Sequence, residues 1–466
     1  MKKLFCLLIF IYPVVVCAQQ PWIKDTPLVI AWQYVGYPAF TPGTVNYTSL
    51  AFNPHDGNAY IAFSDGGYGN KVTVEKFVSP NWVNVGSAGF SGGPAAWTSL
   101  AFDTLGNPYV AFEDWSHSRK ATLMGFDGTN WDTIGKQGFS TNAVQYTSLA
   151  FSPAGQPYVA YSDTAKNKKA TVMMFNDTSW VDVGKTGFSQ GAAYYVSMAF
   201  GPSGEPYVGF QDLGNGGKAS VMTFNDTAWV NFGSAAFTPG TALFTDLVFS
   251  QAGKAYIAFE DMANSQKVTV MRYDTSWKIV GTAGFSAGEA WYESLAFNYR
   301  GIPYVAYRDF ANSEKATVMK FSGTSWVNVG DSGFSAGAVD YTSLAFSPNG
   351  TTPYVGYKDE GNSDHASVMK FDTLNTTGIN NITELRLSVY PDPATDKITV
   401  ELSGLQNETS LSIVDIRGQQ LMMRQITDLK TRVDISGLTD GVYFVRLTNN
   451  RSVEVKKFIK QTNRSN

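Results

Sequence analysis

The chain has 466 residues and a formal net charge of minus four, from 35 lysines and arginines against 39 aspartates and glutamates. This near balance, with no basic run, argues against a nucleic-acid partner, because binding the phosphate backbone needs clustered positive charge. The two cysteines and the three histidines (His55, His117 and His365) have no common spacing, so neither a metal site nor another cofactor is expected.

The first 18 residues have the order of a secretory signal peptide: a charged start, an apolar run at Leu4–Val16 and a small residue at Ala18. Both cysteines, Cys6 and Cys17, fall inside this leader. A lipoprotein anchored through Cys17 is the alternative, but the residue before it is too large for that signal. The apolar run is shorter than the roughly 20 residues of a membrane-spanning helix, so we expect export and no membrane span.

A unit of 48 to 50 residues then repeats along the chain. Each unit holds four short runs, such as "YTSLAF", "YVAYSD", "KATVMMF" and "WVDVG", which are rich in Val, Tyr, Phe and Thr and bounded by turn residues. Four strands at this period are typical of one blade of a β-propeller. Apolar residues stand side by side in the second and third runs, which predicts sheets covered on both faces by neighbouring blades.

The first three runs occur seven times, but the tryptophan run follows them only six times; the seventh copy, with Trp32, stands at the start of the chain. We therefore predict that residues 28–36 form the outer strand of the last blade. Residues 28–372 are then one all-β, seven-bladed propeller with four-stranded blades, whose ring is closed by the N-terminal strand and leaves no free sheet edge at the seam.

An aromatic residue opens the innermost strand of every repeat, where it can stack on sugar rings near the channel mouth. The alternative is that each ring packs on the phenylalanine of the "GFS" loop motif. These candidate ligand-binding residues are Tyr47, Trp97, Tyr146, Tyr195, Phe244, Tyr292 and Tyr341.

An aspartate closes the second strand of every repeat, on the same face of the predicted ring. These turn aspartates are Asp65, Asp114, Asp163, Asp212, Asp261, Asp309 and Asp359. A lysine follows six residues later in six repeats, and His365 takes that place in the seventh. The structural interpretation is a cross-strand ion pair or a carboxylate that caps the turn; the functional one is an acidic ring for a cation or for sugar hydroxyls.

Catalysis needs an acid and a base in different environments, so an enzyme should break the sevenfold pattern. Two breaks are visible. The position before the turn aspartate varies, and we expect it to be solvated; its residues are Ser64, Glu113, Ser162, Gln211, Glu260, Arg308 and Lys358. Asp246 replaces the serine found before the other strand leucines. Neither break assembles a catalytic constellation, so no catalytic residue is predicted.

A polar linker at residues 373–385 leads to a second β domain at residues 386–466, where strands such as "KITVEL" alternate. The stretches "LSVYPDPATDKITVEL", "LSIVDIRGQQL", "VDISGLTDGVYFVRL" and "VKKFIK" resemble the C-terminal sorting domain of type IX secretion cargo in Bacteroidetes. The resemblance implies a compact β-sandwich that directs the cargo across the outer membrane. Its signature positions fall on Pro391, Pro393, Gly418, Gly441, Tyr443 and Lys457. Asp392 departs from the usual asparagine, and an accessory sandwich without a sorting role is the alternative.

The sequence thus indicates a protein exported through the periplasm to the outer cell surface or the medium, with the type IX machinery as its partner. We expect a non-catalytic binding or adhesion propeller, whose ligand is a glycan or a surface partner held at seven similar sites. The alternatives are a polysaccharide-active enzyme, either a glycoside hydrolase or a lyase, and a structural surface protein.

Overall fold

The computed structural model describes residues 30–373, 387–402, 409–415, 420–426, 428–448 and 453–462. The predicted signal peptide, and all but the first residue of the predicted linker, lie outside these ranges. No helix within them has the length and apolar character needed to cross a membrane.

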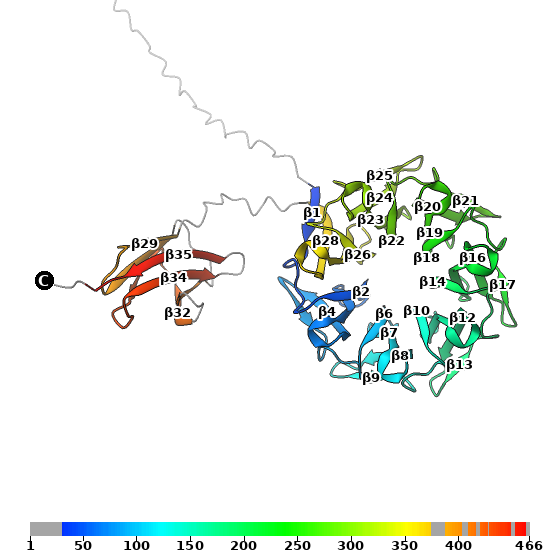
Figure 1. Ribbon diagram of the computed structural model, residues 1–466, viewed down its shortest axis with the longest axis horizontal. Helices are drawn as coiled ribbons and strands as arrows, with labels where there is room; N and C mark the ends of the chain where they lie inside the picture. The colour runs from blue at the N-terminus through cyan, green and yellow to red at the C-terminus, as the bar shows by residue number, and fades with distance from the viewer. Residues whose placement is uncertain are drawn as a thin grey trace, which may run out of the picture.

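Residues 30–373 form seven antiparallel sheets of four strands each, arranged as blades around a central channel (Figure 1). This confirms the predicted seven-bladed propeller. Neighbouring blades are joined by loops. In six blades the four strands follow one another in chain order from the centre outward, and in the seventh β26, β27 and β28 are followed by β1.

The strand bounds repeat closely from blade to blade. The innermost strands are β2 (Val45–Phe52), β6 (Ala95–Phe102), β10 (Val144–Phe151), β14 (Ala193–Phe200), β18 (Ala242–Phe249), β22 (Ala290–Phe297) and β26 (Val339–Phe346). The second strands are β3 (Ala59–Asp65), β7 (Pro108–Asp114), β11 (Pro157–Asp163), β15 (Pro206–Asp212), β19 (Ala255–Asp261), β23 (Pro303–Asp309) and β27 (Pro353–Asp359). The third strands are β4 (Lys71–Val78), β8 (Lys120–Phe126), β12 (Lys169–Phe175), β16 (Lys218–Phe224), β20 (Lys267–Tyr273), β24 (Lys315–Phe321) and β28 (His365–Thr373). The outer strands are β5 (Asn81–Asn84), β9 (Trp131–Thr133), β13 (Trp180–Asp182), β17 (Trp229–Asn231), β21 (Trp277–Ile279), β25 (Trp326–Asn328) and β1 (Ile30–Tyr34).

A single 3-10 turn joins the second and third strands of every blade. These turns are η1 (Gly66–Tyr68), η2 (Trp115–His117), η3 (Thr164–Lys166), η4 (Leu213–Asn215), η5 (Met262–Asn264), η6 (Phe310–Asn312) and η7 (Glu360–Asn362). They all lie at one end of the blades, which we call the turn face. The tight turns between the other strands lie on the opposite face.

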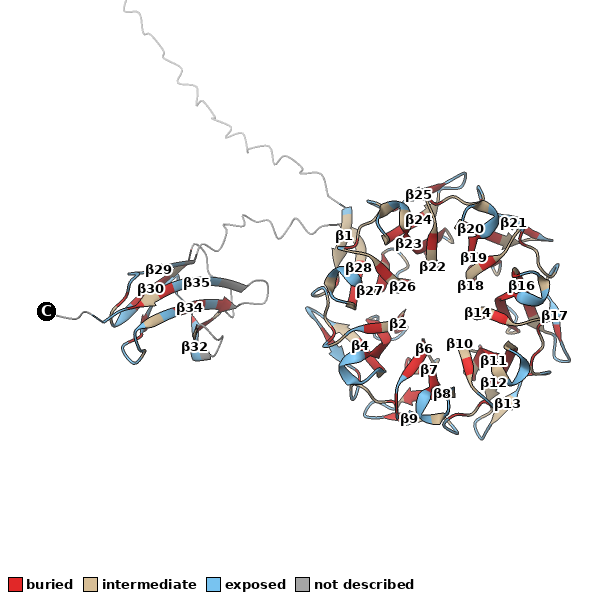
Figure 2. Ribbon diagram, in the orientation of Figure 1, coloured by how far each residue is buried: buried red, intermediate tan, exposed pale blue. Residues whose placement is uncertain are grey.

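The second strands are buried along almost their whole length, and β3 and β15 are buried at every residue. The third strands are buried over four successive positions, as in β12. This confirms that the sheets are covered on both faces, as the side-by-side apolar residues indicate. Figure 2 shows the buried residues within the blades and the exposed ones mainly in the loops.

The ring closes as predicted, because β1 pairs with β28 in the last blade and Trp32 lies opposite Phe371 (Figure 1). Each junction between blades contains a phenylalanine of the loop that reads "GFS" in five repeats and "AFT" in the other two. This phenylalanine stacks on the tryptophan of the next outer strand. At the seam Phe334 stacks on Trp32 with the ring centroids 3.9 Å apart, and the indole N–H donates to the Val329 carbonyl at 2.6 Å. Phe285 and Trp326 make the same contact one junction earlier, at 4.2 Å.

The C-terminal part holds two further sheets, in the orders β29-β30-β33 and β32-β31-β34-β35, which form a sandwich-like domain. Its core includes Ile398, Ile413, Val445 and Phe458, none of which is exposed. The strands are β29 (Leu387–Tyr390), β30 (Lys397–Leu402), β31 (Thr409–Asp415), β32 (Gln420–Ile426), β33 (Lys430–Asp434), β34 (Gly441–Thr448) and β35 (Val453–Lys460).

Candidate ligand site in the propeller channel

The seven aromatic residues that open the innermost strands all have backbone φ angles between 47° and 58°. Each lies at a break in strand register, as between Asn46 and Ser49 around Tyr47. A β-bulge of this kind re-aims a side chain, and its left-handed residue is usually glycine. A bulky side chain in this conformation is an outlier that costs of order 1 to 3 kcal/mol. The fold therefore holds seven strained residues at one level of the channel.

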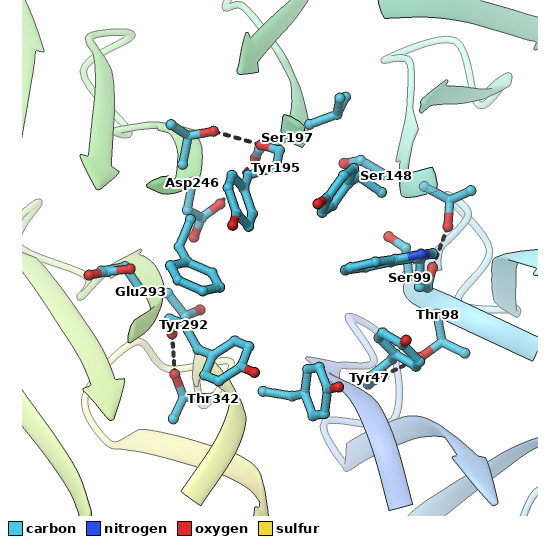
Figure 3. Close-up of a pocket in the computed structure, with 18 of the residues that line it drawn as sticks. Tyr47, Thr98, Ser99, Ser148, Tyr195, Ser197, Asp246, Tyr292, Glu293 and Thr342 are labelled. Atoms are coloured by element: carbon cyan, nitrogen blue, oxygen red, sulfur yellow. Dashed lines mark hydrogen bonds between the residues drawn. The ribbon is translucent and has the colours of Figure 1, made fainter. Parts of the chain in front are cut away.

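These side chains form one closed circle, which we call the aromatic ring (Figure 3). Neighbouring ring centroids are 4.3 to 5.1 Å apart, and neighbouring planes are tilted by 44° to 55°. The half-buried side chains surround a pocket of about 490 Å³ at the turn face of the channel. The alternative packing on the "GFS" phenylalanines is wrong: those rings stack on the outer-strand tryptophans, and the bulge turns the aromatic ring inward instead.

The tyrosine hydroxyls of the aromatic ring give the pocket polar but uncharged groups. Burial raises the pKa of the Tyr292 phenol to about 12, with the nearby Asp340 charge as a smaller cause. Burial likewise raises the pKa of Tyr47, Tyr146, Tyr195 and Tyr341. The five hydroxyls therefore stay neutral near pH 7 and can both donate and accept hydrogen bonds.

Hydrogen bonds between neighbouring blades fix the backbone of the residues that form the aromatic ring. In five blades a threonine donates its hydroxyl to the carbonyl of the aromatic residue in the preceding blade, as Thr245 does to Tyr195 at 2.6 Å. The other four are Thr48, Thr98, Thr147 and Thr342. The serine that follows the threonine in the sequence accepts a hydrogen bond from a backbone N–H of the next blade, as Ser99 does from Leu149 at 3.0 Å. The threonine and serine of the "YTS" sequence thus link neighbouring blades by hydrogen bonds. The repeat pattern alone did not reveal this role.

Two acidic residues break this arrangement in adjacent blades, and both line the pocket. Asp246 takes the serine position and accepts the Leu295 N–H at 2.8 Å and the Ser197 hydroxyl at 3.1 Å. Glu293 takes the threonine position. It is 6% exposed, and neither carboxylate oxygen has a hydrogen-bond partner within the described chain. Figure 3 shows its carboxyl group on the outer side of the aromatic ring, pointing away from the channel.

Burial raises the pKa of Glu293 well above its usual value, and the charges of Glu260 and Asp246 raise it further. Burial therefore favours the protonated form of the Glu293 carboxyl group. Asp246 was recognised from the sequence as a break in the repeat, but Glu293 was not, although "WYESLAF" has glutamate where five other repeats have threonine.

Replacing Glu293 with threonine, the residue of five other blades, should stabilise the propeller by roughly 1 to 3 kcal/mol, because it removes an unsatisfied buried polar group. The folded carboxyl has a raised pKa, so the stability of the wild type falls as pH rises above the unfolded value of 4.5. The variant lacks this fall, so its stability advantage over the wild type in urea melts should grow as the pH rises above about 4.5. An advantage that does not change with pH would contradict the raised pKa of Glu293.

The turn aspartates do not line the pocket, because their carboxylates are buried and bonded within their own blades. In six blades the carboxylate accepts the N–H two residues on, as Asp65 does from Gly67 at 2.9 Å. Asp359 lacks this cap and instead accepts from Asn362 and Ser367. Within residues 30–373, no ion pair joins a turn aspartate to the lysine six residues later. These contacts are those of a carboxylate that caps the turn. They give no support to ligand binding by the turn aspartates.

The position before the turn aspartate is not solvated as expected, since six of its seven residues are buried. It lies opposite the innermost strand beside the bulge, as Ser64 lies opposite Asn46. Arg308 shows the consequence: it is 9% exposed and pairs with the carboxylates of Glu314, Asp340 and Glu360. Burial and the Glu289 charge raise the pKa of Glu260, in the same position, to about 8. In the described part of the chain, no three acidic, histidine or cysteine residues are grouped so as to hold a metal ion.

The sorting-signal positions lie in the C-terminal sandwich, except for Gly418, which is outside the described residues. The Tyr443 ring stacks on Phe458 at 5.8 Å, and its hydroxyl donates to the Thr439 carbonyl at 2.9 Å. Gly441 begins β34, and Lys457 is exposed on β35. Pro391 and Pro393 flank Asp392, whose carboxylate accepts the Ile459 N–H at 2.8 Å. Aspartate can therefore accept a hydrogen bond at the place where the family usually has asparagine.

Comparison with known proteins identifies this part of the chain. Residues 388–461 match the family model described as the secretion system C-terminal sorting domain. The protein is thus cargo of type IX secretion, destined for the cell surface or the extracellular space. Among curated proteins no similar sequence was found.

Solved structures with a similar course of the chain have low sequence identity. PorZ of Porphyromonas gingivalis, a surface component of the type IX secretion system, has 14% identity and a TM-score of 0.44, over 90% of this chain. This chain spans 60% of the length of PorZ. A polysaccharide lyase of family PL25, an ulvan lyase, has 12% identity and a TM-score of 0.45, over 73% of this chain and 96% of its own. An α-L-arabinanase of Penicillium chrysogenum has 12% identity and a TM-score of 0.39, over 60% and 94%.

Proposed function

We propose that the exported propeller is a non-catalytic binding module and that its ligand is an extended glycan held at the aromatic ring. One observation carries the proposal: all seven blades keep a bulky aromatic residue where the backbone favours glycine. Strain that is maintained in every repeat points to a use for the side chain.

The chemistry of the pocket favours a sugar over an anion. Aromatic faces can stack on the apolar faces of sugar rings, and the neutral phenol groups can bond to sugar hydroxyls. No lysine, arginine or histidine lines the pocket. The aromatic ring encloses one site rather than the seven separate sites expected from the sequence, because its members touch one another. Avidity on a polymer would therefore arise between copies of the protein.

A glycan array probed with the chain from residue 19 onward, followed by calorimetry on the hits, tests this proposal. The double variant Trp97→Gly, Tyr146→Gly should bind at least tenfold more weakly, since two stacking contacts of about 1 kcal/mol or more are lost. Glycine suits the left-handed backbone, so this variant should melt higher than the matching double alanine variant. Tyr37→Ala, at an exposed tyrosine outside the pocket, is the control and should bind normally.

Failure to bind across a broad array would leave the structural surface role as the better account. Equal affinity of the wild type and the glycine variant would place the glycan elsewhere on the protein. A melting difference without a binding difference would show that the aromatic ring serves only the fold.

A polysaccharide-active enzyme is the second candidate, and the observation in its favour is that two acidic residues in neighbouring blades, Asp246 and Glu293, line the pocket, although the Glu293 carboxyl group points away from the channel. The double variant Asp246→Ser, Glu293→Thr copies the residues of the other blades and should fold. Under the binding proposal it retains affinity, and no product forms from a bound polysaccharide. Product formation by the wild type that this variant loses would establish the enzyme instead.

A further inference from the structure

The face opposite the turn face carries a second cavity, a groove of about 670 Å³ between the third and fourth blades. Its aromatic and apolar walls include Tyr158 and Met174 of the third blade and Tyr207 of the fourth. Three carboxylates also line it, those of Asp182, Glu205 and Asp226, and none of its lining residues is a lysine, arginine or histidine.

The other blades show what normally fills this place. The tyrosine near the start of each second strand lies opposite one residue of the third strand, and in four blades that residue is a cation. The residues opposite are Lys76, Gly125, Met174, Thr223, Arg272, Lys320 and Lys370. Lys76, Arg272 and Lys320 each lie 6.0 Å from the ring centroid of their tyrosine, within the range of a cation–π contact.

In two blades this cation also pairs with a carboxylate two residues further along the chain. The Arg272 guanidinium lies over Tyr256 and pairs with Asp274 at 2.7 Å. The Lys370 ammonium, opposite Tyr354, pairs with Asp372 at 2.8 Å. The fifth blade, with Tyr256, Arg272 and Asp274, thus shows the complete template: a tyrosine face, a cation above it and a carboxylate beside the cation.

The groove keeps the tyrosines and the carboxylates of this template but lacks the cation. Met174 and Thr223 stand where four of the other five blades have lysine or arginine, and Asp226 occupies the turn after Thr223. Tyr207 donates its hydroxyl to Glu205 at 3.3 Å, which orients that carboxylate at the groove. The exposed carboxylates of Asp182 and Asp226 have no cation from the groove's own lining residues to neutralise them.

We propose that this groove binds an organic cation with an aliphatic stem, such as an alkylammonium or guanidinium group, supplied by another molecule. The ligand's charge takes the place of the missing lysine between the tyrosine faces and the carboxylates, and its stem packs on Met174. This site lies on the opposite face from the aromatic ring and is independent of the proposed glycan binding.

Methyl NMR of the full chain from residue 19, with ¹³C-labelled methionine, tests the proposal because Met174 lines the groove. n-Butylammonium represents a free amine, Nα-acetyl-lysine methylamide represents a lysine side chain of a partner protein, and n-butanol is the neutral control. We expect saturable shifts of the Met174 signal with at least one cation and none with n-butanol. Which cation binds more tightly distinguishes the two sources.

The variant Thr223→Lys places a lysine of the protein itself opposite Tyr207, as Lys320 lies opposite Tyr304. It should melt at the same temperature as the wild type but bind the cationic probe at least tenfold more weakly. Lys320→Met, in a blade outside the groove, is the matched control and should leave binding unchanged. Equal shifts with n-butanol, no shift with either cation, or undiminished binding by a folded Thr223→Lys variant would each overturn the proposal.

Discussion

Replacing Trp32 with alanine is expected to cost the propeller about 3 kcal/mol of unfolding free energy, because large-to-small changes at buried aromatic residues cost 3 to 5 kcal/mol. Trp32 is half-buried, which places it at the lower end of that range. The change removes the stacking on Phe334 and the hydrogen bond to Val329, and so loosens the seam between the last two blades. Urea unfolding at equilibrium measures the effect.

Trp326→Ala is the matched control, since Trp326 makes the same contacts inside the ring with Phe285 and Val280 and is 7% exposed. It should cost about 3 to 5 kcal/mol. A chain that begins at Thr41 loses β1 altogether, leaves β28 as an open edge and should melt lower than either variant. Normal melting of both the Trp32 variant and the shortened chain would contradict the closed ring.

Removing residues 386–466 is expected to abolish export across the outer membrane, because this segment contains the sorting domain matched at residues 388–461. A fluorescent protein joined to the first 18 residues and to residues 373–466 should reach the surface or the medium of a type IX-competent host. The same fusion without residues 386–466 should remain in the periplasm. Cell fractionation with fluorescence readout measures both.

A host without type IX secretion provides the control, in which both fusions should stay inside the outer membrane. A fusion with Tyr443→Ala tests the fold of the sandwich separately, because Tyr443 is buried against Phe458. Equal export with and without residues 386–466 would show that the matched domain does not direct secretion of this protein.

The architecture could be predicted because it depends on repeated local signals. Turn residues and strand runs recur at one period, and the single displaced tryptophan run at Trp32 identifies the strand that closes the ring. The "GFS" phenylalanines have no partner in the sequence pattern, however. Their stacking on tryptophans of the next blade depends on how neighbouring blades pack. The sequence of a single repeat does not contain this information.

The candidate site was predicted only in part, for the same reason. The seven aromatic positions were found because they recur, but their left-handed backbone and mutual contacts follow from a bulge that leaves no mark in residue type. Glu293 was missed because a glutamate in a strand that lines the channel is expected to face water. Nothing in the sequence shows that its carboxyl group is buried. The turn aspartates allowed both a capping and a ligand-binding interpretation, since a buried cap and an exposed binding carboxylate look alike in sequence.

The most direct test of the central claim, that the aromatic ring holds a glycan, is a crystal structure of the chain from residue 19 onward with the tightest-binding oligosaccharide from the array. We expect sugar rings in the 490 Å³ pocket, stacked on members of the aromatic ring such as Trp97 and Tyr146, with the oligosaccharide uncleaved. An oligosaccharide bound elsewhere while the pocket holds none, or one cleaved beside Asp246 and Glu293, would contradict it.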